Sequence, residues 1–218
     1  MRETTLTLLL TGEFICDVRY PDAWRYLEQT SAREEVEHLL GCLGRRLTQT
    51  PQGGTWFAAY ARIDKEERAA IREELVDIKH NLRFLVEFFV QAMQALQQDQ
   101  FLAPGTLIET NRLLAAIDEN PRLRNDILAL APPGKGPVGE GSARAALERL
   151  LKRLRDAGYL TLKNAERDIY AVTGKIEYLQ SVVQFLMNHH GIPEELSEED
   201  ALMDNPPGHQ ETLTLELA

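Results

Sequence analysis

The pattern that most constrains this chain occurs twice: an amphipathic helix ends at a glycine and is followed by two β-prone runs around a polar turn. In the first copy apolar residues one helical turn apart precede Gly44, and in the second a stripe of leucines precedes Gly158. Apolar side chains at this spacing share one face of a helix, and paired β-prone runs around a turn predict a hairpin. The runs are residues 46–50 and 55–60 in the first copy, and 159–162 and 168–173 in the second. The sequence therefore predicts a repeated helix–hairpin unit.

The remaining segments favour a mainly helical chain of the α+β class, built from two tandem winged-helix domains joined by a helical region. Ser31 and Glu34 have the spacing of a capping box, and Asp64 precedes a long helix-periodic run that reaches residue 98. Further helices are predicted at residues 4–11, 22–28, 107–119, 121–130, 142–157 and 175–188, with a short strand at 14–16. The expected domains are residues 1–63 (N-terminal winged helix), 64–105 (connecting and dimerisation region), 106–190 (C-terminal winged helix) and 191–218 (a disordered acidic tail).

Charge is distributed unevenly along the 218 residues, whose formal net charge is -10. Residues 131–175 carry nine Lys/Arg against five Asp/Glu, whereas residues 176–218 carry nine Asp/Glu and no Lys/Arg. An acidic chain is not expected to coat nucleic acid indiscriminately, but it can still present a local basic surface. No apolar stretch is long enough to cross a membrane, and no signal-peptide cleavage site follows the first residues. With only two cysteines, the sequence predicts a soluble cytoplasmic protein without a disulfide framework.

The sequence contains no motif in the context that a catalytic, cofactor or metal site requires. Residues 134–139 match G-x-G-x-x-G, but a dinucleotide site needs a β-strand directly before the motif, and here a helix end precedes it. His189 and His190 are adjacent and would point apart on a helix, and no cysteine or histidine pair has metal-ligand spacing. We therefore expect no enzymatic activity, no cofactor and no metal.

A basic helix and the hairpin after it form the candidate DNA-binding set. Their leucine stripe would be buried, so the basic side chains should project outward, as on the recognition helix of a helix-turn-helix protein. The alternative is a solvated helix face, since Glu148 and Asp156 can pair with part of the set. Any contact should be to the DNA backbone, because the helix carries no Asn or Gln to read base edges. The set is Arg144, Arg149, Lys152, Arg153, Arg155, Lys163 and Arg167.

A dense apolar cluster on the long helix is the candidate dimer or partner interface: Phe84, Phe88, Phe89 and Met93. A core role is the alternative. The side chains point in partly different directions, and a helix that is apolar on two faces usually has two packing partners.

The chain resembles the MukE family, and more closely its MksE branch, the small accessory subunits of bacterial condensins. The resemblance spans about residues 5–190. It rests on residues 46–60 around the first turn, on the long helix after Asp64, and on residues 146–160, a Leu/Arg-rich helix ending at Gly158 before the second hairpin. It implies a non-catalytic homodimer that binds a MukF/MksF-like kleisin and, through it, a MukB/MksB-like SMC ATPase.

The same resemblance implies that double-stranded DNA is held in the assembled, nucleoid-associated complex, for chromosome condensation and segregation or for plasmid defence, as in Wadjet-type relatives. A winged-helix transcription regulator is the alternative. It would need a basic recognition helix with base-reading side chains. The first unit instead carries Glu34, Glu35 and Glu37 against Arg33 on the equivalent helix, which disfavours that reading.

Overall fold

The structure is a computed structural model that describes residues 1–96, 102–131 and 143–188. Its described part contains helices and two small antiparallel sheets, which confirms the α+β class. The glycine-rich residues 134–139, the adjacent histidines 189–190 and the acidic segment 191–218 all lie outside the described residues.

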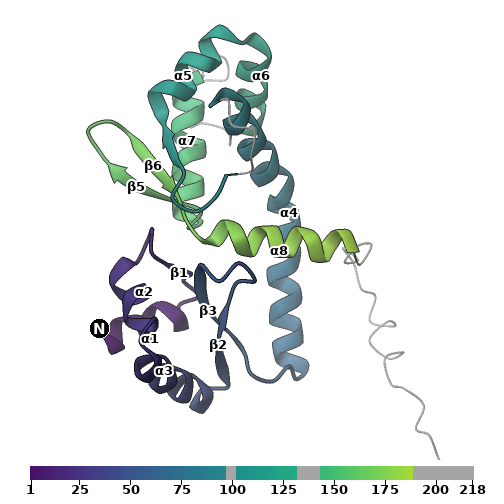
Figure 1. The fold of residues 1–218 in the computed structure, drawn as a ribbon. Coiled ribbons are helices and arrows are strands. Elements are labelled where there is room, and N and C mark those ends of the chain that lie inside the picture. The colour runs from purple at the N-terminus through teal and green to yellow at the C-terminus, as the bar shows by residue number, and fades with distance from the viewer. Residues whose placement is uncertain (97–101, 132–142, 189–218) are drawn as a thin grey trace, which may run out of the picture.

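The N-terminal half combines three helices with a three-stranded sheet of order β1-β3-β2 (Figure 1). Its elements, in chain order, are α1 (Arg2–Leu10), β1 (Ile15–Cys16), α2 (Pro21–Leu27), α3 (Thr30–Cys42), β2 (Arg45–Gln49) and β3 (Thr55–Tyr60). The register pairs Leu47 with Ala58 and Ile15 with Trp56.

The C-terminal half has a similar plan, with three helices rather than two between its first strand and its hairpin. Its sheet has the order β4-β6-β5 and is again antiparallel. The elements are β4 (Leu107–Glu109), α5 (Thr110–Glu119), α6 (Pro121–Leu130), α7 (Ala143–Asp156), β5 (Leu160–Asn164) and β6 (Ile169–Val172). In both halves the strand that precedes the helices pairs with the last strand, which also closes the hairpin.

Two long helices connect the halves. The helix α4 (Lys65–Ala95) leads from one sheet into the core of the other half, and α8 (Lys175–Asn188) runs across α4 between the two halves (Figure 1). Tyr178 of α8 contacts the rings of Phe14 and Phe57, at centroid distances of 4.8 and 5.5 Å. These aromatic contacts join α8 to the N-terminal sheet.

A glycine sets the direction of the second hairpin. Gly158 follows α7 with φ of 84°, a left-handed conformation that favours glycine. Its N–H donates to the Arg155 carbonyl at 3.0 Å, and the Tyr159 N–H donates to the Leu154 carbonyl at 2.9 Å. This pair of bonds is the Schellman motif, and it turns the chain from the helix directly into β5.

Each half has its own hydrophobic core. The N-terminal core is built around residues such as Leu27, Leu40 and Trp56. The larger C-terminal core combines the leucine stripe of α7 with Phe88 and Phe89 of α4.

Three sequence-based expectations for the elements need correction. The predicted helix at 107–119 begins only at Thr110, because Leu107–Glu109 pair with β6 as strand β4. Ser31 is not an N-cap: α3 begins at Thr30, Gln29 is its N-cap, and no side chain makes a capping bond. The long helix ends at Ala95 rather than near residue 98.

Candidate functional site

The outward face of α7 alternates basic and acidic side chains. Arg144 pairs with Glu148 at 3.0 Å and Lys152 with Asp156 at 2.5 Å, each one helical turn apart. The hydrogen bond from Lys152 lowers the pKa of the Asp156 carboxyl. The face therefore keeps a modest positive charge rather than a strong one, and exposed pairs of this kind add little stability.

Arg155 and the second hairpin extend this face. Arg155 lies 3.5 Å from Asp156 and is half-buried beside Tyr170 of β6. Burial raises the pKa of the Tyr170 phenol, whose side chain packs against the C-terminal core. In the β5–β6 turn, the backbone N–H of Arg167 donates to the Asn164 side chain at 3.0 Å.

Lys163 and Arg153 point away from this face. The Lys163 ammonium donates to the Val18 carbonyl of the N-terminal half at 2.6 Å, so the second hairpin is tied to the other half of the chain. Arg153 turns toward α4, where it donates to the Asn81 side-chain oxygen at 2.5 Å and lies over the Phe84 ring, 4.1 Å from its centroid. The seven predicted basic residues thus do not form one surface.

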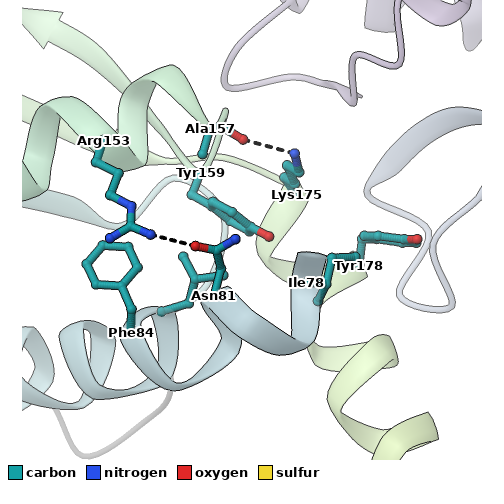
Figure 2. Close-up of a pocket in the computed structure, with 9 residues that line it drawn as sticks. Ile78, Asn81, Phe84, Arg153, Ala157, Tyr159, Lys175 and Tyr178 are labelled. Atoms are coloured by element: carbon teal, nitrogen blue, oxygen red, sulfur yellow. Dashed lines mark hydrogen bonds between the residues drawn. The ribbon is translucent and has the colours of Figure 1, made fainter. Parts of the chain in front are cut away.

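Arg153 lines a pocket of about 360 Å³ where α4, α7 and α8 meet (Figure 2). Lys175, at the start of α8, is the second cation of its wall and donates to the Ala157 carbonyl at 2.9 Å. Figure 2 shows Asn81 and Tyr159 between the two cations. The lining of this cationic pocket is Ile78, Asn81, Phe84, Leu85, Arg153, Ala157, Tyr159, Lys175 and Tyr178.

Two of the four residues of the predicted apolar interface on α4 lie in the core of the chain itself. Phe88 and Phe89 are 1% and 0% exposed within the chain itself. They contact each other edge to face at 5.7 Å, and both belong to the C-terminal core. Neither side chain has surface to offer a second chain. Phe84 and Met93 are partly buried against the same core and retain some exposed area.

An apolar groove of about 290 Å³ lies on the N-terminal side, between β3 and the first half of α4. Its apolar walls are Phe57, Tyr60, Ile63, Ile71, Leu75 and Tyr178. Ile63 is 54% exposed and stands at the rim of this apolar surface. Arg45 and Arg46 of β2 line the same groove, and the Arg45 guanidinium lies 3.7 Å from the centre of the Tyr60 ring. The groove thus offers apolar surface bordered by positive charge.

Sequence reasoning missed both hollows because each is assembled from elements distant in the chain. The sequence predicts only a helix at Lys175 and Tyr178, and only a connection at Ile63. A large apolar residue directly before a predicted helix cap was the available signal for Ile63, since exposed apolar side chains grouped together often mark binding surfaces.

Other kinds of site receive no support from the described residues. In residues 1–96, 102–131 and 143–188, no cluster of His, Cys, Asp and Glu is arranged to hold a metal ion. Across the same ranges, no helix combines the length and the apolar character needed to span a bilayer.

Comparison with known proteins gives one family. The family model described as condensin complex protein MksE matches residues 4–183. No curated protein matches the chain.

Proposed function

The chain belongs to the MksE family of condensin complex proteins, and we propose that it is a non-catalytic accessory subunit that binds a kleisin as a homodimer. Through the MukF/MksF-like kleisin it would join a MukB/MksB-like SMC ATPase. The proposal extends the resemblance of residues 46–60 and 146–160 to the partners of such complexes.

Each half of the chain is, in this proposal, a winged-helix domain. The supporting observation is the repeated topology: strand orders β1-β3-β2 and β4-β6-β5, each with helices between the first strand and the closing hairpin. Both hairpins begin after a positive-φ glycine, Gly44 in one half and Gly158 in the other. Winged-helix domains serve protein partners as well as DNA, so the fold alone does not decide the partner.

The apolar groove is the surface that we propose for the kleisin, and it carries the functional proposal. It brings together side chains from β3, α4 and α8, and it leaves the large aliphatic Ile63 more than half exposed. An extended chain segment can fill such a groove with alternate side chains, and it can also add a strand to the outer edge of β2. No nucleotide or metal is needed for this kind of binding.

The groove is tested by charge substitution at its exposed edge. The full chain and its kleisin would be co-expressed, and their affinity measured by calorimetry. Replacing Ile63 with Glu should weaken binding at least about tenfold, because an unpaired carboxylate in an apolar contact is costly. Leu43, 60% exposed and absent from the groove lining, offers a matched control in Leu43→Glu. Equal binding by both variants and the parent would reject the groove, and failure of the parent to bind would reject the kleisin partnership.

DNA contact is proposed for the outward face of α7, in the assembled complex only. The face carries Arg144, Arg149, Lys152 and Arg155 with two carboxylates among them. Phosphate contacts by such side chains position a duplex without reading its sequence. The net charge of -10 opposes binding by the isolated chain, so the kleisin and ATPase would have to hold the duplex nearby. The complex would thereby act on the nucleoid or on plasmids.

The homodimer is part of the same proposal, but Phe88 and Phe89 cannot form its interface in this conformation. Phe84 and Met93 remain as partly exposed candidates, and Val90, 38% exposed on the same helix, lies next to the buried pair. Light scattering of the purified chain tests the assembly state, with about twice the 24.7 kDa chain mass expected.

A further inference from the structure

Three arginines stand together at one end of the N-terminal hairpin. Arg45 and Arg46 begin β2, and Arg62 follows the end of β3 at Tyr60. The hairpin brings them close, because β2 and β3 pair from Arg45 opposite Tyr60 onward. Among the ion pairs of the described residues, none involves any of the three arginines. Arg46 and Arg62 are exposed, whereas Arg45 is half-buried. We call these three residues the arginine rim.

The arginine rim lies in a positive stretch of an otherwise acidic region. Residues 44–72 hold six Lys/Arg against three Asp/Glu, whereas residues 1–43 hold four against eight. Residues 73–130 are acidic again, with five Lys/Arg against nine Asp/Glu. An anionic partner is therefore attracted to this stretch and repelled by the segments on either side of it.

The arginine rim borders the apolar groove between β3 and α4. Leu47 of β2 and Ala58 of β3 pack against the N-terminal core, and side chains alternate between the two faces of a strand. Arg46 and Phe57 therefore lie on the opposite face, and both line the groove. The groove thus has a guanidinium group directly beside its aromatic wall.

The two exposed arginines are suited to bind carboxylates. A guanidinium stays charged at any physiological pH, and it can hold a carboxylate through two parallel hydrogen bonds. Arg62 directly precedes Ile63, which is 54% exposed at the groove. A carboxylate bound by Arg62 would therefore lie next to an apolar contact.

We infer that the segment held in the groove is acidic as well as apolar. It fills the hollow with a large aliphatic or aromatic side chain and places neighbouring carboxylates on Arg46 and Arg62. The inference rests on the proposed binding of a kleisin at this groove, and it states the chemistry of the kleisin segment. Arg46 and Arg62 then determine specificity, because a segment with Lys or Arg beside its apolar residue would be repelled.

A DNA duplex fits these observations less well than a protein segment. Phosphates can pair with arginines, but the phosphate backbone has no aliphatic or aromatic group to cover Phe57, Ile71 and Leu75 of the groove. A duplex is also long and uniformly charged, so the acidic residues 1–43 would repel it. A short acidic segment needs only the positive stretch.

The test measures the affinity of the full chain for its co-expressed kleisin by calorimetry, at low and at high salt. Arg46→Gln with Arg62→Gln removes two exposed ion pairs and should weaken binding about tenfold at low salt. The difference should shrink at high salt, because salt screens the same ion pairs in the parent. Arg46→Lys with Arg62→Lys keeps both charges, so its affinity should lie between those of the parent and the Gln variant.

A matched variant controls for the loss of charge. Arg122→Gln with Arg124→Gln removes the same charge from exposed positions on α6 and should leave kleisin binding unchanged. Equal weakening by the α6 variant would overturn the inference, as would a Gln variant of the arginine rim that binds like the parent at low salt. Unchanged kleisin binding combined with weaker DNA entrapment by the complex would assign the arginines to DNA instead. All these positions are exposed, so the melting temperatures should stay close to that of the parent.

The variant Ile63→Glu separates this inference from the proposed function. If Ile63→Glu loses kleisin binding while the Gln variant of the arginine rim keeps it, the groove remains the kleisin site but its occupant is not selected by charge. If Ile63→Glu binds the kleisin as tightly as the parent, the groove is not the kleisin site, and the acidic occupant is rejected with it.

Discussion

The Thr50 hydroxyl donates a hydrogen bond of 2.5 Å to the Glu177 carboxylate, across 127 residues of sequence. Thr50 closes the turn between β2 and β3, and Glu177 lies in the first turn of α8. Both are buried, Thr50 at 4% and Glu177 at 7% exposure. The contact therefore couples the two halves through a buried polar pair, in which the loss of one partner is costly.

Removing the Thr50 hydroxyl should destabilise the junction of the halves. Thr50→Val keeps the side-chain shape but leaves the buried Glu177 carboxylate without this donor, at an expected cost of about 1–3 kcal/mol. Urea denaturation of the variant and the parent measures the difference. Thr50→Ser retains a hydroxyl and should lie much closer to the parent, and equal stabilities for Val and Ser would argue against the coupling.

Adding a methyl group at Gly174 should be more damaging than at an open glycine. A Cβ there would stand 2.8 Å from the Cys16 Cβ and would collide with the Thr55 hydroxyl. Such overpacking typically costs about 1–3 kcal/mol, so Gly174→Ala should lower the melting temperature. Gly41 has no atom near its own Cβ position and lies in α3. Gly41→Ala should therefore stabilise by up to about 1 kcal/mol, and a loss there as large as at position 174 would contradict this reading.

Local signals predicted most of the elements, whereas contacts between distant segments escaped prediction. The glycines at 44 and 158 and the β-prone runs after them specify the hairpins by short-range chemistry, and the structure confirms both hairpins. Strand β4 was missed because its three residues gain strand geometry only from pairing with β6. The Thr50–Glu177 bond has no sequence signature, because neither residue is unusual in its own element.

The core role of Phe89 leads to a third prediction. Its side chain is fully buried and contacts Phe88 and Tyr159. Phe89→Ala should cost about 3–5 kcal/mol of unfolding free energy through the cavity it leaves. The loss should be the same at all protein concentrations, whereas an interface residue would make stability concentration-dependent. Leu43→Ala, at a position 60% exposed on the N-terminal half, should change stability by less than about 0.5 kcal/mol. A stable monomer from Phe89→Ala, with unchanged unfolding, would restore the interface reading.

The basic residues show why periodicity alone could not define the candidate site. Helical spacing predicted correctly that the basic side chains of α7 avoid the leucine face. It could not predict that Arg153 packs on Phe84 of α4, or that Lys163 reaches the Val18 carbonyl. These two contacts depend on how α4 and the N-terminal half pack against α7. That packing is determined by the whole fold and not by the sequence of α7 alone.

The last prediction separates DNA contact from a merely solvated helix face. Arg144 and Lys152 are exposed on α7 and pair only with carboxylates of the same helix in the described contacts. Reversing both to Glu should weaken DNA entrapment by the complex of this chain with its kleisin and ATPase, while leaving kleisin binding intact. Loss of two phosphate contacts should also reduce the dependence of binding on salt, by about 2 in the slope of log affinity against log salt.

Arg122→Glu with Arg124→Glu changes the total charge equally from α6, and therefore controls for general repulsion of DNA. Arg153 is left unchanged because it lines the cationic pocket, and altering it would confuse the two surfaces. If the α7 and α6 variants lose DNA entrapment to the same extent, the loss is caused by the change in net charge and not by a contact of α7 with DNA. A phosphate-binding surface that loses two cations and gains two carboxylates must lose affinity for DNA. If the α7 variant nevertheless entraps DNA as well as the parent at physiological salt, the outward face of α7 makes no DNA contact.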